Sequence, residues 1–340
     1  MQKWLLLFFI GLNVTTVRAQ EFKDTMFQHF TINTTELPEF EIHVTKSYDD
    51  RKKPLIIYLD GSGNFPIYYP NRNGRTASSI AMNIRKYSKD YIFALISKPG
   101  IPFYDSLKYT ETGRPYYPPN DEYKQLYSLD WRAVTASETI DYLVKEMPVD
   151  PNQIIVMGYS EGSQVAPMVA VLNDKVTHVV CFAGNALNQL YDFILEARLN
   201  VERGLMNAEQ GQRVVDSLYL EYEKIYKEPN SVTKSWYGAT YRKWASFSRV
   251  TPLENMLQLD IPILYLGGGR DNNQTILDMD YAKLEFLRQG KTNLTYKVYP
   301  NCDHYFQELR TIEGKVERVD RLDEVNEFAI QWIHANVQTD

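Results

Sequence analysis

The chain has 340 residues, of which 44% are hydrophobic and 24% charged, and its formal net charge is −6. This length allows one large hydrophobic core or at most two domains. No basic run or aromatic–basic stripe is present, which argues against a nucleic-acid partner. The two cysteines, Cys181 and Cys302, are too few for a disulfide scaffold, and the sequence leaves open whether they pair.

The first residues, MQKWLLLFFIGLNVTTVRAQ, have the pattern of a secretory signal peptide. Lys3 is followed by the apolar run 4–12 and by a small-residue cleavage site that ends at Ala19. The alternative is a membrane anchor, for which the apolar run has about half of the ~20 residues required. We expect residues 1–19 to be removed. The mature chain, residues 20–340, is then secreted or periplasmic with no stable membrane span.

Eight short apolar or β-branched segments predict strands, and helical patterns separate the later ones. Several of these segments are apolar on both faces, as parallel strands covered by helices must be. The strands are expected at 29–33, 39–45, 54–61, 91–97, 153–159, 177–184, 261–268 and 294–300, and helices at 130–147, 162–172, 276–289 and 321–337. This alternation predicts an α/β fold with a mostly parallel eight-stranded sheet and helices on both faces. The first two strands adjoin without a helix and can form an antiparallel hairpin.

One stretch, residues 185–250, interrupts the alternation between the sixth and seventh strands. It shows helical patterns at 188–204 and 208–226 but no convincing strand. Its many aromatic residues and its shortage of Gly, Pro and Ser argue against a linker. We predict a helical lid inserted into a single catalytic domain.

The segment GYSEGS places Ser160 where a strand must turn into a helix. Gly158 and Gly162 stand two residues to either side, and small residues there allow a tight turn that exposes the serine. The simpler alternative is a turn with a helix cap. A serine hydroxyl becomes a nucleophile only beside a base, usually a histidine that a carboxylate orients.

A histidine and an aspartate follow later strands in positions that suit this chemistry. His304 comes directly after the eighth strand, whereas the other four histidines lie in or near predicted strands or the last helix. Asp271 follows the seventh strand, so both residues are expected at the carboxyl edge of the sheet, where α/β sites assemble. Asp303 and Asp60 are competing carboxylates, of which Asp303 is expected to point away. The chain order Ser160, Asp271, His304 predicts a catalytic triad.

Two backbone amides are candidates for an oxyanion hole. The loop LDGSG after the third strand holds Ser62 between Gly61 and Gly63, and glycines let backbone approach a ligand closely. The N–H of Ser62 and that of Glu161, which follows the nucleophile, fit the two-donor arrangement. The alternative for this loop is a simple glycine-rich turn.

From about residue 39 to its end the chain resembles the α/β-hydrolase superfamily. LDGSG, GYSEGS, GGGRD and DHYF occur in the expected order, and within the superfamily the chain is similar to bacterial serine carboxylic-ester hydrolases with a helical lid. The resemblance implies Ser160, Asp271 and His304 as triad. The chain departs from the usual pattern at Asp60, where a histidine is expected, and at Tyr159 and Glu161 beside the nucleophile.

The activity expected from this resemblance is hydrolysis of a small-molecule carboxylic ester through an acyl-enzyme. The alternatives are a peptidase or aminoacyl hydrolase, in which Glu161 or Glu196 would anchor a charged substrate terminus, a thioesterase or acyltransferase with the same triad, and a non-catalytic binding protein. No H-E-x-x-H, paired-cysteine or G-x-G-x-x-G pattern occurs, so neither a metal nor a cofactor is expected. The oligomeric state is left open.

Aromatic residues of the insertion are candidate substrate contacts, because the insertion leaves the sheet at the edge that carries Ser160. These candidates are Trp236, Tyr237, Tyr241 and Trp244. An aromatic roof would select a bulky or hydrophobic ester and exclude large folded proteins. The alternative is that these side chains only pack the helices of the insertion together.

Overall fold

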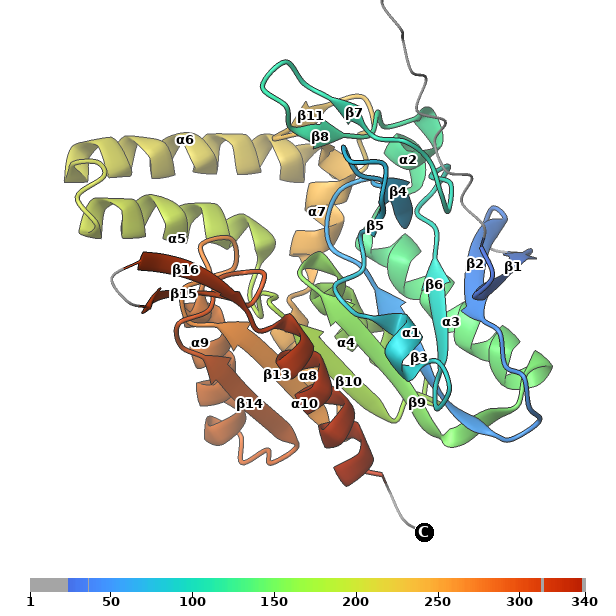
Figure 1. Ribbon diagram of the computed structural model, residues 1–340. Helices are drawn as coiled ribbons and strands as arrows, with labels where there is room; N and C mark the ends of the chain where they lie inside the picture. Colours follow the sequence, from blue (N-terminus) through green and yellow to red (C-terminus); the bar gives the residue numbers. More distant parts are fainter. Residues whose placement is uncertain (1–23, 36, 313–314, 338–340) are drawn as a thin grey trace, which may run out of the picture.

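The centre of the fold is one eight-stranded sheet (Figure 1). The structure is a computed structural model that describes residues 24–35, 37–312 and 315–337. From one edge to the other the strands are β1 (Phe27–Ile32), β2 (Phe40–Thr45), β6 (Ile92–Ile96), β3 (Lys53–Leu59), β9 (Val149–Tyr159), β10 (His178–Phe182), β13 (Ile263–Gly268) and β14 (Leu294–Tyr299). Each strand overlaps one of the eight predicted segments, which confirms the predicted sheet.

The direction of the strands brings four loops to one edge of the sheet. β1 pairs with β2 in antiparallel register, as expected, and β2 is antiparallel to β6. From β6 to β14 every neighbouring pair is parallel. The loops after β3, β9, β13 and β14 therefore leave the sheet at the same edge, and these loops carry the residues that the sequence singled out.

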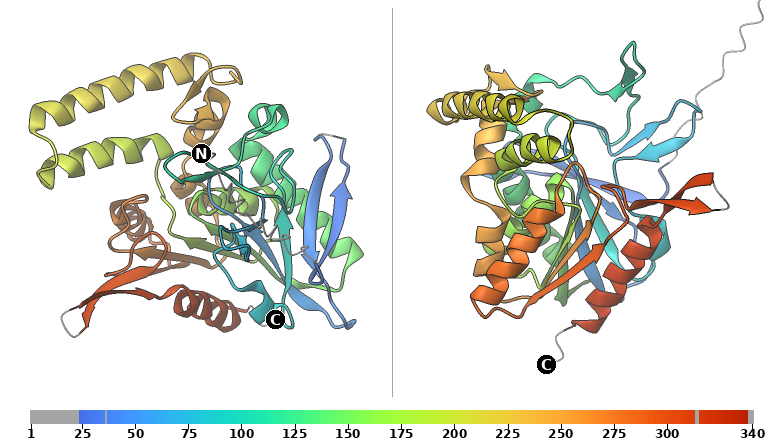
Figure 2. Two further views of the ribbon diagram at one scale, coloured as in Figure 1. Left: turned by 45° about the horizontal axis from the view of Figure 1, so that its top comes forward. Right: turned by 90° about the vertical axis from the view of Figure 1, so that its left-hand side faces the viewer.

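Helices cover both faces of the sheet (Figure 2). In β3, Leu55 and Ile57 belong to one apolar core, and the alternating Ile56 and Tyr58 belong to the other, because successive side chains of a strand point to opposite faces. The first core is covered by α3 (Leu129–Glu146), α4 (Glu161–Leu172), α8 (Pro252–Gln258) and α9 (Ile276–Arg288), and the second by α1 (Ile84–Tyr87) and α10 (Leu322–Ala335).

Between β10 and β13 the chain forms a helical insertion with α5 (Gln189–Glu202), α6 (Ala208–Lys227) and α7 (Tyr241–Arg249). α5 and α6 lie side by side and extend beyond the sheet (Figures 1 and 2). A small apolar core joins them to α7: Leu190, Tyr222, Ile225, Tyr241, Trp244 and Ala245.

The absence of strands from residues 185–250 was a wrong expectation. β11 (Ser235–Trp236) and β12 (Ala239–Thr240) form a short antiparallel hairpin. Tyr237 and Gly238 both have positive φ, 45° and 81°, as a two-residue hairpin turn of type I′ requires. Arms of two residues are too short to show an alternating pattern.

The sequence analysis also missed several short elements outside the main sheet. They are β4 (Tyr68–Pro70), β5 (Thr76–Ser78), β7 (Lys108–Tyr109), β8 (Pro115–Tyr116), α2 (Asp121–Leu126), β15 (Gln307–Ile312) and β16 (Lys315–Asp320), together with the helices α1, α7 and α8. β16 is almost wholly exposed, so it carries no buried apolar face that a pattern could reveal.

Cys181 and Cys302 are both buried free thiols. In the part of the chain that the structure describes, no helix is long and apolar enough to cross a bilayer. The predicted signal peptide, residues 1–19, lies outside the described residues.

Candidate active site

Ser160 occupies a strained corner between β9 and α4. Its backbone has φ 52° and ψ −120°, a conformation that a residue with a side chain rarely adopts. The corner is held because the N–H of Ser160 donates to the carbonyl of Phe182 at 2.8 Å, and the N–H and hydroxyl of Ser163 both donate to the carbonyl of Ser160. Strain of this kind persists only where the surroundings impose it, and it occurs mostly at functional sites.

The two glycines around the corner are required by close packing. A Cβ on Gly158 would collide with the carbonyl of Gly162, and a Cβ on Gly162 would collide with the carbonyl of Leu59 in β3. Both contacts are with backbone, which cannot move aside. The corner therefore needs both glycines of the G-x-S-x-G segment, as the sequence predicted.

Ser160, His304 and Asp271 lie in hydrogen-bond contact. Nε2 of His304 is 3.1 Å from Oγ of Ser160, and Nδ1 of His304 is 2.7 Å from Oδ2 of Asp271. An ionised carboxylate can only accept, so Nδ1 carries the ring proton and Nε2 is free to accept the proton of the serine hydroxyl. This is the geometry that nucleophile activation needs.

Surrounding contacts hold the histidine and the aspartate in place. The Tyr159 hydroxyl donates to the carbonyl of His304 at 2.6 Å. The other carboxylate oxygen of Asp271, Oδ1, accepts the N–H groups of Asn273 and Gln274 at 2.7 and 2.8 Å. Both His304 and Asp271 are almost fully buried, which restricts movement of the histidine ring.

The two competing carboxylates have other partners. Oδ1 of Asp303 accepts the N–H groups of Tyr305 and Gln307, and so closes the turn after His304. Asp60 pairs with Lys98 and Arg132, each at 2.8 Å. The structure thus brings Asp271 to the histidine, and places neither Asp303 nor Asp60 in hydrogen-bond contact with it.

The predicted oxyanion amides belong to segments that adjoin the serine. A Cβ on Gly61 would be 3.4 Å from Cβ of Ser160, so the loop after β3 passes directly beside the nucleophile. Among the described residues, no oxygen accepts a hydrogen bond from the N–H of Ser62. The N–H of Glu161 begins α4, where the first amides have no partner within the helix. Two unpaired donors beside a serine can stabilise a negative oxygen.

The charge of Glu161 does not face substrate as a free carboxylate, which corrects the suggestion that it could anchor a substrate terminus. Its side chain is only 1% exposed and forms an ion pair with Lys243 at 2.8 Å. Arg132 lies 3.7 Å away, and Tyr127 donates a hydrogen bond. Burial would raise the pKa of Glu161, but the charges of Lys243 and Arg132 outweigh it and lower that pKa to about 2.

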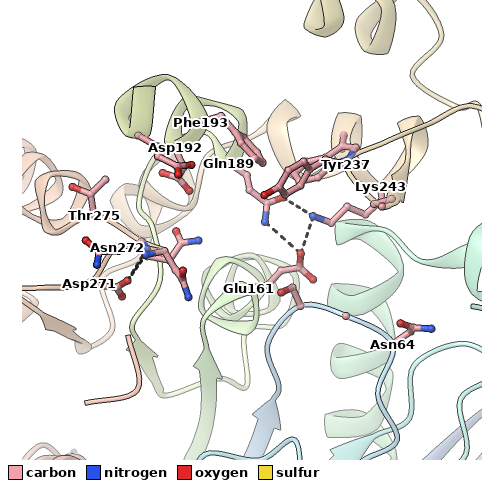
Figure 3. Close-up of a pocket in the computed structure, with 18 of the residues that line it drawn as sticks. Asn64, Glu161, Gln189, Asp192, Phe193, Tyr237, Lys243, Asp271, Asn272 and Thr275 are labelled. Atoms are coloured by element: carbon pink, nitrogen blue, oxygen red, sulfur yellow. Dashed lines mark hydrogen bonds and ion pairs between the residues drawn. The ribbon is translucent and has the colours of Figure 1, made fainter. Parts of the chain in front are cut away.

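A pocket of about 530 Å³ opens beside these residues (Figure 3). Its walls come from α5, the β11–β12 turn, α7, and the loops after β3 and β13. Much of the lining is polar, with the amide side chains of Asn64, Gln189, Asn272, Asn273 and Gln274 and the carboxylates of Asp192 and Glu196. The expected apolar roof is therefore replaced by a mixed surface that can hydrogen-bond a polar ligand.

The four predicted aromatic contacts divide into two groups. Tyr237, which is 74% exposed, and Trp244 line the pocket. Trp236 packs among Phe193, Tyr237 and Trp244. Tyr241 is buried and its hydroxyl donates to Glu221 at 2.6 Å. Trp236 and Tyr241 therefore pack the helices of the insertion together, which was the alternative to a substrate contact.

A buried pair of carboxyl groups beside the pocket was not found from the sequence. Asp192 of α5 lines the pocket, and Asp278 of α9 is 1% exposed. No N–H or hydroxyl group of the described residues donates to Asp278, so only a bound proton can relieve the repulsion between the two neighbouring carboxyl groups. Burial raises the pKa of both, that of Asp278 to about 6. Separation of the two residues by 86 positions leaves no sequence signal for this contact.

Solved structures share the fold, although no protein-family model and no curated protein sequence matches the chain. An uncomplexed acylaminoacyl peptidase of Pyrococcus horikoshii superposes with a TM-score of 0.58 and 13% identity, over 92% of this chain and 42% of that one. The dipeptidyl peptidase 4 of Porphyromonas gingivalis gives 0.54 and 13%, over 91% and 35%. A puromycin-hydrolyzing peptidase of Mycobacterium tuberculosis gives 0.56 and 12%, over 92% and 40%.

These similarities establish the α/β-hydrolase fold. The chain spans about two-fifths of the length of the solved chains that it matches. At 12–13% identity the shared property is the arrangement of sheet and helices, since one fold can carry many chemistries.

Proposed function

We propose that this protein is a serine hydrolase that cleaves acyl bonds through a covalent acyl-enzyme. The observation that carries the proposal is the continuous contact from Ser160 through His304 to Asp271. In the first step His304 accepts the hydroxyl proton as Ser160 Oγ attacks the carbonyl carbon, and the carbonyl oxygen becomes negative beside the N–H groups of Ser62 and Glu161. His304 then gives the proton to the leaving group, and water repeats the sequence to release the acid.

We propose further that the acyl compounds it cleaves are short peptides or aminoacyl amides rather than apolar esters. Two features support this: the named neighbours in fold are peptidases, and amide side chains that can hydrogen-bond a peptide backbone line the pocket. Asp192 and Glu196, one turn apart on α5, add carboxyl groups that suit a substrate amine. The insertion restricts the site to small molecules.

The first experiment asks whether Ser160 is a nucleophile at all. A fluorophosphonate probe is expected to label the wild-type protein at Ser160, and Ser160→Ala is expected to stay unlabelled with an unchanged circular dichroism spectrum. Hydrolysis by Ser160→Ala should fall by roughly 10⁴- to 10⁶-fold, since only oxyanion stabilisation and binding remain. A wild-type protein that takes up no label would contradict the proposed chemistry.

The second experiment separates the substrate classes. The wild-type protein is assayed on aminoacyl and dipeptidyl p-nitroanilides with free and with acetylated amino groups, and on p-nitrophenyl esters from acetate to decanoate. We expect turnover of at least one anilide with a free amino group. Turnover of esters alone, with every anilide left intact, would mean that the ester hydrolase expected from sequence resemblance is the right assignment.

A further inference from the structure

The ammonium group of Lys98 is directed into the loop that follows β3. Lys98 lies two residues after β6, and its side chain is 4% exposed. Nζ donates to the carbonyl of Gly61 at 2.7 Å, to the carbonyl of Gly63 at 2.6 Å and to Oδ2 of Asp60 at 2.8 Å. An ammonium group has three N–H donors, and here all three end on one stretch of four residues.

These contacts determine how the peptide groups of the loop are turned. The described chain contains no cis peptide bond, and in a trans peptide the C=O and the N–H point in opposite directions. The carbonyl of Gly61 and the N–H of Ser62 belong to one peptide group. When Lys98 binds that carbonyl, the N–H of Ser62 is directed away from Lys98. Ser62 also lines the pocket.

Among the described residues, no other group donates a hydrogen bond to the carbonyls of Gly61 and Gly63. Gly61 and Gly63 have no side chains, and Gly63 has φ 91°, so the segment has a wide choice of conformations. Arg132 holds Asp60 through its carbonyl and its carboxylate but does not contact the carbonyls of Gly61 or Gly63. In the part of the chain that the structure describes, Lys98 is thus the residue that binds the carbonyls of the two glycines after Asp60.

We propose that Lys98 is a positioning residue for the oxyanion hole: it turns the Ser62 amide toward the substrate carbonyl. This inference rests on the proposed acyl chemistry of Ser160. The cation also polarises the Gly61–Ser62 peptide group, which makes the Ser62 N–H a stronger donor. The benefit is largest in the transition state, when the carbonyl oxygen carries most charge.

The test compares Lys98→Met with Lys53→Met, a matched loss of a buried lysine. Lys53 is 6% exposed, pairs with Asp49 at 3.4 Å, and lies at the opposite end of β3 from the loop. The readouts are the rate constant for fluorophosphonate labelling of Ser160, which needs no known substrate, and kcat and KM on an anilide that the wild type cleaves. Thermal melting monitors folding.

We expect Lys98→Met to slow labelling by at least about tenfold and to lower kcat by about 10- to 100-fold, with KM within about threefold, since a missing oxyanion donor costs 10²- to 10³-fold. Lys53→Met should lower Tm but leave the labelling rate within about twofold. A folded Lys98→Met protein that is labelled as fast as Lys53→Met overturns the inference while the proposed function stands. An unlabelled wild type overturns both.

Lys98→Arg covers the case in which Lys98→Met does not fold. It keeps the charge that Asp60 needs, but a planar guanidinium cannot direct three donors at the same three oxygens. We expect a folded protein whose labelling is at least about threefold slower than that of the wild type. A rate equal to that of the wild type overturns the inference.

Discussion

Two groups of buried charges lie beside the same pocket and are built in opposite ways. On one side three cations, Lys98, Arg132 and Lys243, alternate with Asp60 and Glu161, and every carboxylate contacts two of the cations. On the other side lie Asp192 and Asp278, carboxyl groups that face each other. We call these groups the alternating cluster and the carboxyl pair.

The alternating cluster and the carboxyl pair offset the cost of buried charge in different ways. Opposite charges in contact offset the cost of removing each from water, provided that none is lost. Two adjacent carboxyl groups can only reduce their repulsion by holding a proton. The alternating cluster therefore fixes the backbone around Ser160 over a wide pH range, whereas the state of the carboxyl pair depends on pH and on what enters the pocket.

The largest expected effect concerns Asp271. This carboxylate lies on the same side of the pocket as the carboxyl pair, but its partner is His304. Asp271→Asn should lower kcat by about 10³- to 10⁴-fold, because an amide can leave the histidine in the wrong tautomer. The control is Asp303→Asn, for which we expect a loss of less than about tenfold. If steady-state kinetics show the reverse ranking, Asp303 is the orienting carboxylate.

The next effect tests the alternating cluster. Glu161→Gln leaves Lys243 without a counter-charge in a buried site, whereas Arg132 keeps its ion pair with Asp60. The unpaired ammonium group should cost about 3–5 kcal/mol of unfolding free energy. The control Glu327→Gln removes a carboxylate whose ion pair with Lys86 is exposed, and should change Tm by less than about 1 °C. Equal melting temperatures for the two variants would show that the cluster contributes no net stability.

The carboxyl pair should make the unfolding free energy depend on pH. The pKa of Asp278 is raised in the folded state to about 6 from the usual 3.8, so the folded protein binds the proton more tightly than the unfolded chain. The resulting stabilisation is complete below pH 4 and is lost as pH rises through 6. Asp192→Asn removes one carboxyl group and lets an amide N–H donate to Asp278.

We therefore expect Asp192→Asn to raise the unfolding free energy relative to wild type at pH 8, by on the order of 1–3 kcal/mol, and to change it less at pH 4.5. Denaturant melts at the two pH values measure the difference. Asp216→Asn, an exposed change on α6, should show no such dependence. A constant difference between pH 4.5 and 8 would mean that the pair does not share a proton.

The smallest expected effect concerns the aromatic residues above both groups. Tyr237→Ala should shift the ratio of kcat/KM between anilides with large and small side chains by roughly tenfold, the size of one lost pocket contact, with little change in Tm. Trp236→Ala should lower Tm and leave that ratio nearly unchanged, because its ring packs on Phe193 and Trp244. Equal selectivity in both variants would mean that the hairpin turn does not touch substrate.

The main sheet and the corner at Ser160 follow from local patterns in the sequence. All eight strands of the sheet show as apolar segments, since a strand buried on both faces needs side chains such as those of Ile154, Ile155 and Val156. Gly158 and Gly162 can also be recognised in the sequence. Their backbone lies so close to other backbone atoms that no larger residue fits at either position. Placement of Asp271 and His304 after neighbouring strands needs only the rule that parallel strands end at one edge.

Export is a different case: the prediction that rests on residues 1–19 stays a prediction, because those residues lie outside the part of the chain that the structure describes. Its basis is likewise local, a charged start followed by a short apolar run.

Only the tertiary structure decides which charges meet. Nothing in the sequence near Glu161 indicates a partner for its carboxylate, yet Lys243 of α7, 82 positions later in the chain, forms an ion pair with it. Asp192 and Asp278 lie on separate helices with no shared motif, and Lys98 resembles any lysine after a strand. The partner of a charged side chain cannot be identified from spacing in the sequence, because an ion pair needs only that two charged groups lie close together in the folded protein. The chain pattern of this protein therefore determines its sheet and the location of its candidate active site, whereas the packing of α3, α5, α7 and α9 around that site decides its electrostatics.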